Sequence, residues 1–199
     1  MASEALIQWH GKRAEHIDEL LSVHVRVVGA GRGRHSATTQ LNLAVLLRLA
    51  AEFQGFCRDL HDLASDEFAS RVGGPNARLQ QLVASQLTRG RKLNGGNANP
   101  GNIGSDYARL GLDLWPELAK RRPRRAPAWN RSLSAMNEAR NGVAHDDQAA
   151  LARVAKAGYH LSALSTIKNF RRDAAQVAVL MDDVVAEHLP LLFGGDKPW

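Results

Sequence analysis

Apolar side chains recur at every third or fourth position along most of the chain, which is the spacing of one face of an α-helix. The widest such stripe runs from about Ser36 or Thr39 to Leu63, and its width is typical of a central helix that packs on more than one side. The stripe consists of Leu41, Val45, Leu46, Leu49, Phe53, Phe56, Cys57, Leu60 and Leu63. Because Cys57 lies among these apolar positions, we expect it to be a buried core thiol.

The same periodicity, together with helix-terminating residues, predicts the other helices. Ser3 and Asn99 are suited to cap helix N-termini, and Pro100 suits a first helical position. Gly111 follows the end of a predicted helix. Further helices are expected at about residues 3–28, 76–88, 100–110, 129–144, 147–156 and 165–188. We therefore expect one all-α domain over residues 1–199, a bundle of six or seven helices.

The positive charge of the chain is concentrated in one segment. Lysine and arginine number 26 against 20 acidic residues, which gives a formal net charge of +6. One basic run holds Lys120, Arg121, Arg122, Arg124 and Arg125. Because Pro123 and Pro127 interrupt helical patterns here, we expect a loop over residues 116–128. A compact basic loop attracts phosphates and favours RNA as a partner, and a solvated, flexible linker is the equally weighted alternative.

Composition excludes several classes of protein. A hydrophobic content of 44% is too high for a disordered chain, and the single cysteine excludes an intramolecular disulfide or a cysteine-rich zinc cluster. The longest apolar stretch, residues 41–56, is interrupted by polar and charged residues, so we expect no membrane span. No signal peptide is evident, and a cytoplasmic location is expected. The glycines at 29, 31 and 33 lack the spacing and the preceding strand of a dinucleotide-binding loop.

The scattered histidines and tryptophans have less specific interpretations. His61 lies near Asp59 and Asp62, but no set of histidines and carboxylates has the spacing of a metal site, so neither a metal nor a cofactor is predicted. We expect surface or capping roles for these histidines. Trp115 and Trp129 flank the basic loop and are expected to anchor the core, or alternatively to stack an RNA base.

One segment combines a guanidinium, an amide and an imidazole near a helix end. Glu138, Asn141 and His145 fall at i, i+3 and i+7, so they share one helix face. Arg140 lies at the edge of that face, five residues before His145. Its long side chain, or a last turn loosened by Gly142, brings the guanidinium toward the imidazole.

These groups suit phosphodiester chemistry. A histidine with an ordinary pKa of about 6.5 exchanges protons at cellular pH, and an arginine stabilises the negative charge that develops on a phosphorane. Asn141 would orient the imidazole or bind substrate, and no metal is needed when a ribose 2′-OH is the nucleophile. On spacing alone, the favoured alternative is that His145 caps a helix C-terminus and Arg140 is a surface cation.

Three segments resemble a known family. Residues 140–145, RNGVAH, resemble the Arg-Asn-x-x-Ala-His form of the motif of HEPN domains. Residues 46–60 are similar to the AAFEGFLRDL helix of the RiboL-PSP-HEPN branch. Residues 93–103, followed by 110–113, are similar to the NPNPDNI…LGID segment of that branch. The matches stand in the order of the branch and together cover about residues 40–190.

The resemblance implies a HEPN-like helical bundle that acts as a metal-independent endoribonuclease in toxin–antitoxin, abortive-infection or antiviral systems. Arg140 and His145 would be its catalytic pair, and Asn141 their polar partner. HEPN ribonucleases usually form dimers in which the motifs of two chains make one cleft. The partners implied are therefore RNA, a second copy of the chain and an antitoxin protein, with no membrane. Two alternatives stay open: a non-catalytic HEPN module that binds RNA or a protein, and a helical interaction domain whose basic loop binds DNA.

The chain departs from the branch at two positions. Gln54 stands where the branch often has glutamate, so nearby Glu52 becomes the acidic candidate, and both are grouped with Glu138 as supporting residues. Asp147 stands where some HEPN toxins have a tyrosine that a partner nucleotidyltransferase modifies, so that regulation is not predicted.

The chemistry of 2′-OH attack also favours a dimer. Attack by a 2′-OH needs a base and departure of the 5′-oxygen needs an acid, whereas the motif offers only His145 in each chain.

Overall fold

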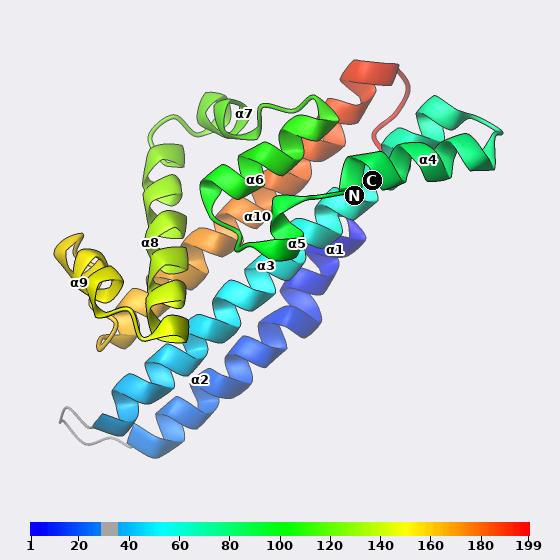
Figure 1. The fold of residues 1–199 in the computed structure, drawn as a ribbon. Coiled ribbons are helices and arrows are strands. Elements are labelled where there is room, and N and C mark those ends of the chain that lie inside the picture. The colour runs from blue at the N-terminus through cyan, green and yellow to red at the C-terminus, as the bar shows by residue number, and fades with distance from the viewer. Residues whose placement is uncertain (29–35) are drawn as a thin grey trace.

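The computed structural model describes residues 1–28 and 36–199, and within these ranges every regular element is a helix (Figure 1). The predicted all-α bundle is therefore confirmed. None of the helices in these ranges combines the length and the apolarity needed to span a bilayer. The glycines at 29, 31 and 33 lie outside the described residues. In chain order the elements are α1 (Glu4–Gln8), the π-helical turn η1 (Trp9–Arg13), α2 (Ala14–Val28), α3 (Ser36–Gly73), α4 (Ala77–Thr88), α5 (Lys92–Gly95), α6 (Pro100–Tyr107), the 3-10 turn η2 (Ala108–Leu110), α7 (Leu114–Arg121), α8 (Ala126–His145), α9 (Gln148–Lys156) and α10 (Leu164–Phe193).

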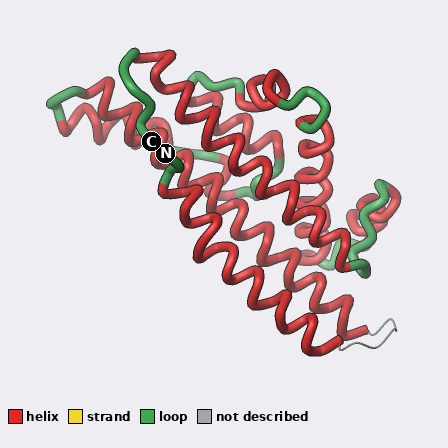
Figure 2. The backbone as a smooth tube through the Cα atoms, turned by 180° about the vertical axis from the view of Figure 1, so that it is seen from behind, coloured by secondary structure: helices red, strands yellow, loops and turns green. Residues whose placement is uncertain are grey.

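Helix α3 forms the centre of the bundle, as its wide apolar stripe predicts. It contacts both α2 and α10, and the two views show these long helices running alongside one another (Figures 1 and 2). Phe53 and Phe56 of α3 are fully buried, and the ring centroid of Trp9 lies 5.8 Å from each of theirs. Cys57 is also fully buried, which confirms the predicted core thiol.

Several helix boundaries differ from the prediction for identifiable reasons. Helix α3 continues past Leu63 to Gly73, because Ala64 and further small residues extend its buried face. The predicted first helix is interrupted at Gly11, where the backbone leaves helical geometry with φ −94° and ψ −108°. Pro190 lies inside α10 rather than after its end.

The basic segment departs most clearly from the sequence prediction. Lys120 and Arg121 are the last residues of α7, and α8 begins with Pro127 in its first turn. Proline is tolerated in a first turn because the N–H groups there have no helical partner. The predicted loop over residues 116–128 is therefore wrong, since only residues 122–125 lie between the two helices.

The shorter helices gather around α8. Helix α8 contacts both α3 and α10, and α9 packs on α8 (Figure 1). Helices α5 and α6 contact α3, and α6 also contacts α8. The C-terminal turns of α8, the segment 92–102 and the middle of α3 therefore border one region of the surface, where the RNGVAH segment lies.

Candidate active site

Arg140, Asn141 and His145 lie in the last turns of α8 and line one open cavity of about 500 Å³. Arg140 and Asn141 are half-buried, whereas His145 is exposed. The cavity is lined by Gln54, Asn94, Gly95, Gly96, Asn97, Asn102, Arg140, Asn141 and His145. We call it the His145 cavity. The five-residue separation of Arg140 and His145 thus does not prevent the guanidinium and the imidazole from sharing one cavity.

Asn141 connects the two walls of the His145 cavity. Its Oδ1 atom accepts a hydrogen bond of 3.0 Å from Nη1 of Arg140 and another of 3.0 Å from Nδ2 of Asn97. The first bond fixes the direction of the guanidinium, and the second ties α8 to the segment that follows α5. The amide nitrogen of Asn141 has no partner within the described part of the chain, so it is available to donate to a bound ligand.

Helix α8 ends directly after His145. Asp146 has left-handed backbone geometry with φ 52°, and the N–H of Asp147 donates to the carbonyl of Gly142 at 2.9 Å. Gly142 does not loosen the turn: it is buried against α9, where an added Cβ would lie 2.8 Å from a methyl carbon of Leu151. The His145 imidazole has no hydrogen-bond partner among the residues that the structure describes. Its place in the last turn is compatible with catalysis and with capping.

The segment that begins in α5 is tied to α3 by Gln54, one of the supporting candidates, and to α6 by Asn102. Nε2 of Gln54 donates to the carbonyls of Leu93 and Gly96 at 2.9 and 2.7 Å. Nδ2 of Asn102 donates to the carbonyl of Asn97 at 2.8 Å. Gln54 therefore lines the His145 cavity, and its amide nitrogen holds the backbone of the cavity wall.

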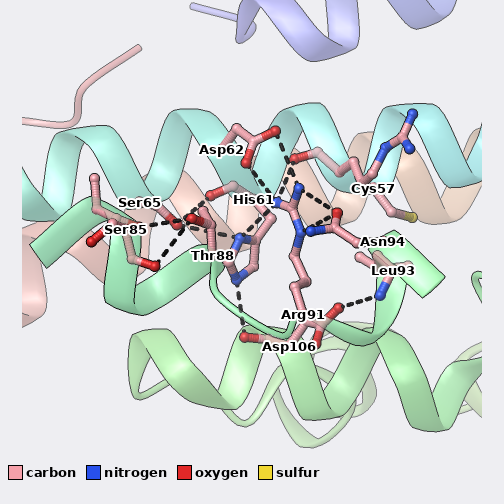
Figure 3. A network of polar contacts seen from close by, with 12 residues as sticks. Cys57, His61, Asp62, Ser65, Ser85, Thr88, Arg91, Leu93, Asn94 and Asp106 are labelled. Atoms are coloured by element: carbon pink, nitrogen blue, oxygen red, sulfur yellow. Dashed lines mark hydrogen bonds and ion pairs between the residues drawn. The ribbon is translucent and has the colours of Figure 1, made fainter. Parts of the chain in front are cut away.

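A buried polar network lies behind this wall (Figure 3). Arg91 is 6% exposed, and its guanidinium donates to Oδ1 of Asp62 at 2.6 Å. It also donates from Nε and Nη2 to Oδ1 of Asn94, at 3.1 and 2.9 Å. The Asp106 carboxylate accepts from the backbone N–H groups of the first two residues of α5, both at 2.8 Å. These bonds fix α5, so they position the wall of the His145 cavity.

His61 is fully buried within the same network, so the surface or capping role expected for it is wrong. Its Nε2 donates to the carbonyl of Asp106 at 3.0 Å, while Nδ1 lies 3.1 Å from Nη1 of Arg91. Because a guanidinium only donates, Nδ1 accepts and the imidazole is neutral. Burial lowers the pKa of His61, and the positive charge of Arg91 acts in the same direction. The sequence pattern does not predict this network, because Arg91 bonds to Asp62 and His61 of α3, which precede it by 29 and 30 residues.

Glu52 does not line the His145 cavity. It belongs to an ion cluster elsewhere on α3, where its carboxylate lies 2.7 Å from Arg13, 2.8 Å from His16 and 2.7 Å from Arg48. Burial opposes ionisation of the carboxyl, but the hydrogen bonds from His16 and Arg13 and the positive charges of Arg48 and Arg13 together outweigh it and lower the pKa of Glu52. The structure therefore gives Glu52 a role in joining η1 and α2 to α3, away from the RNGVAH segment.

Glu138 borders a neighbouring cavity rather than the His145 cavity. Its carboxylate pairs with Arg153 of α9 at 2.6 Å. The neighbouring cavity measures about 510 Å³ and is lined by Asn97, Asn99, Pro100, Gly101, Trp115, Asn130, Ser134, Asn137, Glu138 and Asn141. Because Asn97 and Asn141 line both cavities, the two adjoin along α8. We call the second one the Trp115 cavity.

The five charges of the basic run are divided among different partners. Lys120 pairs with Glu117 and Arg121 with Glu187, each at 2.5 Å. Arg122 and Arg125 line a further cavity beside α10, and Arg124 is exposed in the turn between α7 and α8. None of the five lines the His145 cavity.

The two tryptophans next to the basic segment differ in exposure. Trp129 is buried and donates from Nε1 to Oε1 of Gln176 at 3.2 Å, which confirms the predicted core anchor. Trp115 is half-buried, donates to the carbonyl of Pro100 at 2.7 Å and forms part of the wall of the Trp115 cavity.

Within the described ranges, no group of three or more histidine, cysteine, aspartate and glutamate side chains is arranged to hold a metal ion. The polar side chains that line the His145 cavity are a guanidinium, an imidazole and amides. Comparisons with protein-family models, with curated proteins and with solved structures gave no match.

Proposed function

We propose that this protein is a metal-independent endoribonuclease that cleaves RNA in the His145 cavity. One observation carries the proposal: the Arg140 guanidinium, held by Asn141, and the His145 imidazole line the same open cavity. The resemblance of residues 140–145 to the HEPN motif supports it independently. The amide-rich wall is suited to the hydroxyl and phosphate groups of RNA, because amides both donate and accept hydrogen bonds.

The reaction assigns one task to each of the three side chains. His145 accepts the proton of the ribose 2′-OH while the 2′-oxygen attacks phosphorus. Arg140 stabilises the negative charge on the phosphorane oxygens, and Asn141 holds the guanidinium and donates from its free amide nitrogen. The bond from phosphorus to the 5′-oxygen then breaks, and that oxygen takes up a proton. The products are a 2′,3′-cyclic phosphate and a 5′-hydroxyl.

A second copy of the chain would supply the acid for the leaving 5′-oxygen. His145 is the single histidine among the described residues that line the cavity. Two copies related by a two-fold axis would bring a second imidazole and a second guanidinium to one cleft. We therefore include a homodimer with a composite site in the proposal.

The decisive experiment is an RNA-cleavage assay in EDTA that compares wild type with Arg140→Ala and His145→Ala. We expect each variant to lose roughly 10²-fold or more in rate, and the wild-type products to carry cyclic phosphates. Arg131→Ala and His160→Ala are matched controls, because both residues are exposed and line none of the cavities described. Wild-type rates in Arg140→Ala and His145→Ala would reject the site.

The second candidate function is RNA binding without cleavage. It is favoured by the lack of an orienting hydrogen bond to the His145 imidazole among the described residues, since catalytic imidazoles are usually held by a third group. Salt-sensitive RNA binding with no cleavage in any variant would select this candidate.

For the ribonuclease proposal, the resemblance also favours a toxin or antiviral role. We then expect poor growth on expression, which His145→Ala relieves.

A further inference from the structure

A third cavity lies away from the His145 cavity and shares no lining residue with it. It measures about 550 Å³, within the range of small-molecule sites. Its walls come from η1, the turn between α7 and α8, the start of α8 and the middle of α10. The lining residues are His10, Arg122, Arg125, Trp129, Arg172, Ala175, Gln176, Val179, Leu180 and Asp183. We call it the arginine cavity.

Two of the three guanidiniums of this cavity have no carboxylate partner among the described residues, and the third has only a long contact with one. Arg122 donates only to the backbone carbonyl of Arg121, at 3.1 Å, and Arg125 makes no side-chain hydrogen bond or ion pair with any described residue. Arg172 reaches only its chain neighbour Asp173, at 3.4 Å. By contrast, adjacent Arg171 pairs with Asp18 at 2.5 and 2.9 Å.

Guanidiniums brought together from distant parts of the chain repel one another unless an anion lies between them. Arginine presents a planar fork of donors that matches the oxygens of a phosphate group. Asp183 is the one carboxylate among the lining residues, so the cavity keeps an excess of positive charge even when its histidine is neutral. This charge pattern favours a ligand that carries phosphate.

The floor of the arginine cavity is apolar and partly open. Ala175, Val179 and Leu180 of α10 line it together with Trp129, and Val179 is 40% exposed. The Oε1 atom of Gln176 is used by the Trp129 indole, which leaves the Gln176 amide nitrogen free to donate. A flat ring can lie on such a floor while phosphates reach the guanidiniums, and a nucleotide combines these two parts.

We propose that the arginine cavity binds a nucleotide, with its phosphates held by Arg122, Arg125 and Arg172 and its base against the apolar floor on α10. The proposal does not depend on RNA cleavage in the His145 cavity. The ligand is either a free nucleotide or one nucleotide unit of an RNA chain, since both present the same phosphate and base chemistry.

Calorimetric titration of the full chain tests the proposal with two probes, ATP and a 2′-O-methyl oligonucleotide that cannot be cleaved by 2′-OH attack. We expect Arg125→Ala and Arg172→Ala each to weaken binding about 10-fold or more, because each removes a charge-assisted contact. Asp183→Asn should tighten binding, because it removes a carboxylate beside the phosphates. Arg131→Ala is the control and should bind like wild type.

The two probes distinguish the source of the ligand. ATP binding that is lost in the arginine variants identifies a free nucleotide, and oligonucleotide binding alone with the same losses identifies a unit of RNA. The proposal is overturned if neither probe binds wild type, or if binding is the same in Arg125→Ala, Arg172→Ala and wild type. Because RNA cleavage is measured separately with His145→Ala, failure of one proposal leaves the other standing.

Discussion

The side chains of Asn97 and Asn141 are joined by a hydrogen bond of 3.0 Å that links the segment after α5 to the end of α8. The same oxygen of Asn141 also receives the Arg140 guanidinium at 3.0 Å. The direction of Arg140 is therefore coupled to the position of the opposite wall of the His145 cavity. Asn141, which the sequence suggested only as a polar partner of Arg140 and His145, therefore contacts both walls of the cavity.

Removing the Asn141 amide should reduce RNA cleavage without unfolding the protein. In Asn141→Ala the guanidinium and Asn97 lose their shared acceptor, so we expect the rate to fall on the order of 10–100-fold. The thermal midpoint should change little, because Asn141 is half-buried at the cavity. Asn169→Ala, at an exposed position on α10, is the control for both measurements. An unchanged rate in Asn141→Ala would show that Arg140 does not need this support.

Arg91→Ala should destabilise the fold and the cavity wall together. The substitution leaves Asp62, His61 and Asn94 without their guanidinium partner. Because Asp62 is partly solvated, we expect a loss of about 2–3 kcal/mol in the free energy of unfolding, measured with urea. Arg89→Ala removes an exposed guanidinium two residues earlier and should cost less than about 0.5 kcal/mol. Equal midpoints for the two variants would contradict the importance of the network.

The buried His61 should make stability fall in mild acid. Its pKa in the folded state is lowered from the ordinary 6.5, so the unfolded chain binds the proton more readily. The contribution of His61 is therefore complete above pH 6.5 and is lost as pH falls from there through the lower folded-state pKa. His61→Gln keeps a donor for the Asp106 carbonyl and removes the titration. We expect its melting temperature to vary less than that of wild type between about pH 7 and pH 5, and parallel curves would refute this.

Gly55 allows Arg13 to reach its carboxylate partners. A Cβ at position 55 would lie 2.3 Å from Nη1 of Arg13. This Nη1 pairs with Glu52 at 2.7 Å, and Nη2 of the same guanidinium pairs with Asp59 at 2.5 Å. Although alanine favours helices by about 1 kcal/mol over glycine, we expect Gly55→Ala to destabilise the protein by about 1–2 kcal/mol.

A double-mutant cycle isolates this cause. In an Arg13→Ala background the clash is absent, so adding Gly55→Ala should become neutral or stabilising in urea denaturation. If Gly55→Ala costs the same in both backgrounds, the guanidinium is not the reason for glycine at this position.

Periodicity predicted the elements of this fold better than their partners. Helix α3 was predictable because its apolar stripe indicates a buried face. That Arg140, Asn141 and His145 line one cavity was predictable because they lie close together in the sequence. The sequence alone did not separate the roles of Glu52 and Gln54. These residues stand at positions i and i+2, which point to different faces of a helix. Of the two, Gln54 lines the His145 cavity and Glu52 does not.

The basic run shows the same limit. Composition marks its charge, but the neutralising carboxylate of Arg121 comes from Glu187 on α10, 66 residues later. Arg122 and Arg125 share their cavity with Arg172, which lies on α10, about 50 residues later in the chain. Such pairings depend on how α7, α8 and α10 pack, and local spacing carries no information about that packing.

If the active site is shared between two chains of a dimer, an inactive chain should lower the activity of an active one. If two imidazoles serve one cleft, a wild-type chain paired with His145→Ala lacks either the base or the acid. Adding His145→Ala in excess should therefore lower the activity of a fixed amount of wild type, in proportion to the mixed dimers formed. RNA is kept saturating so that competition for substrate does not contribute, and His160→Ala is the control partner. Activity that is unaffected by the inactive chain, from a protein that sediments as a monomer at micromolar concentration, would mean that one His145 serves the reaction alone.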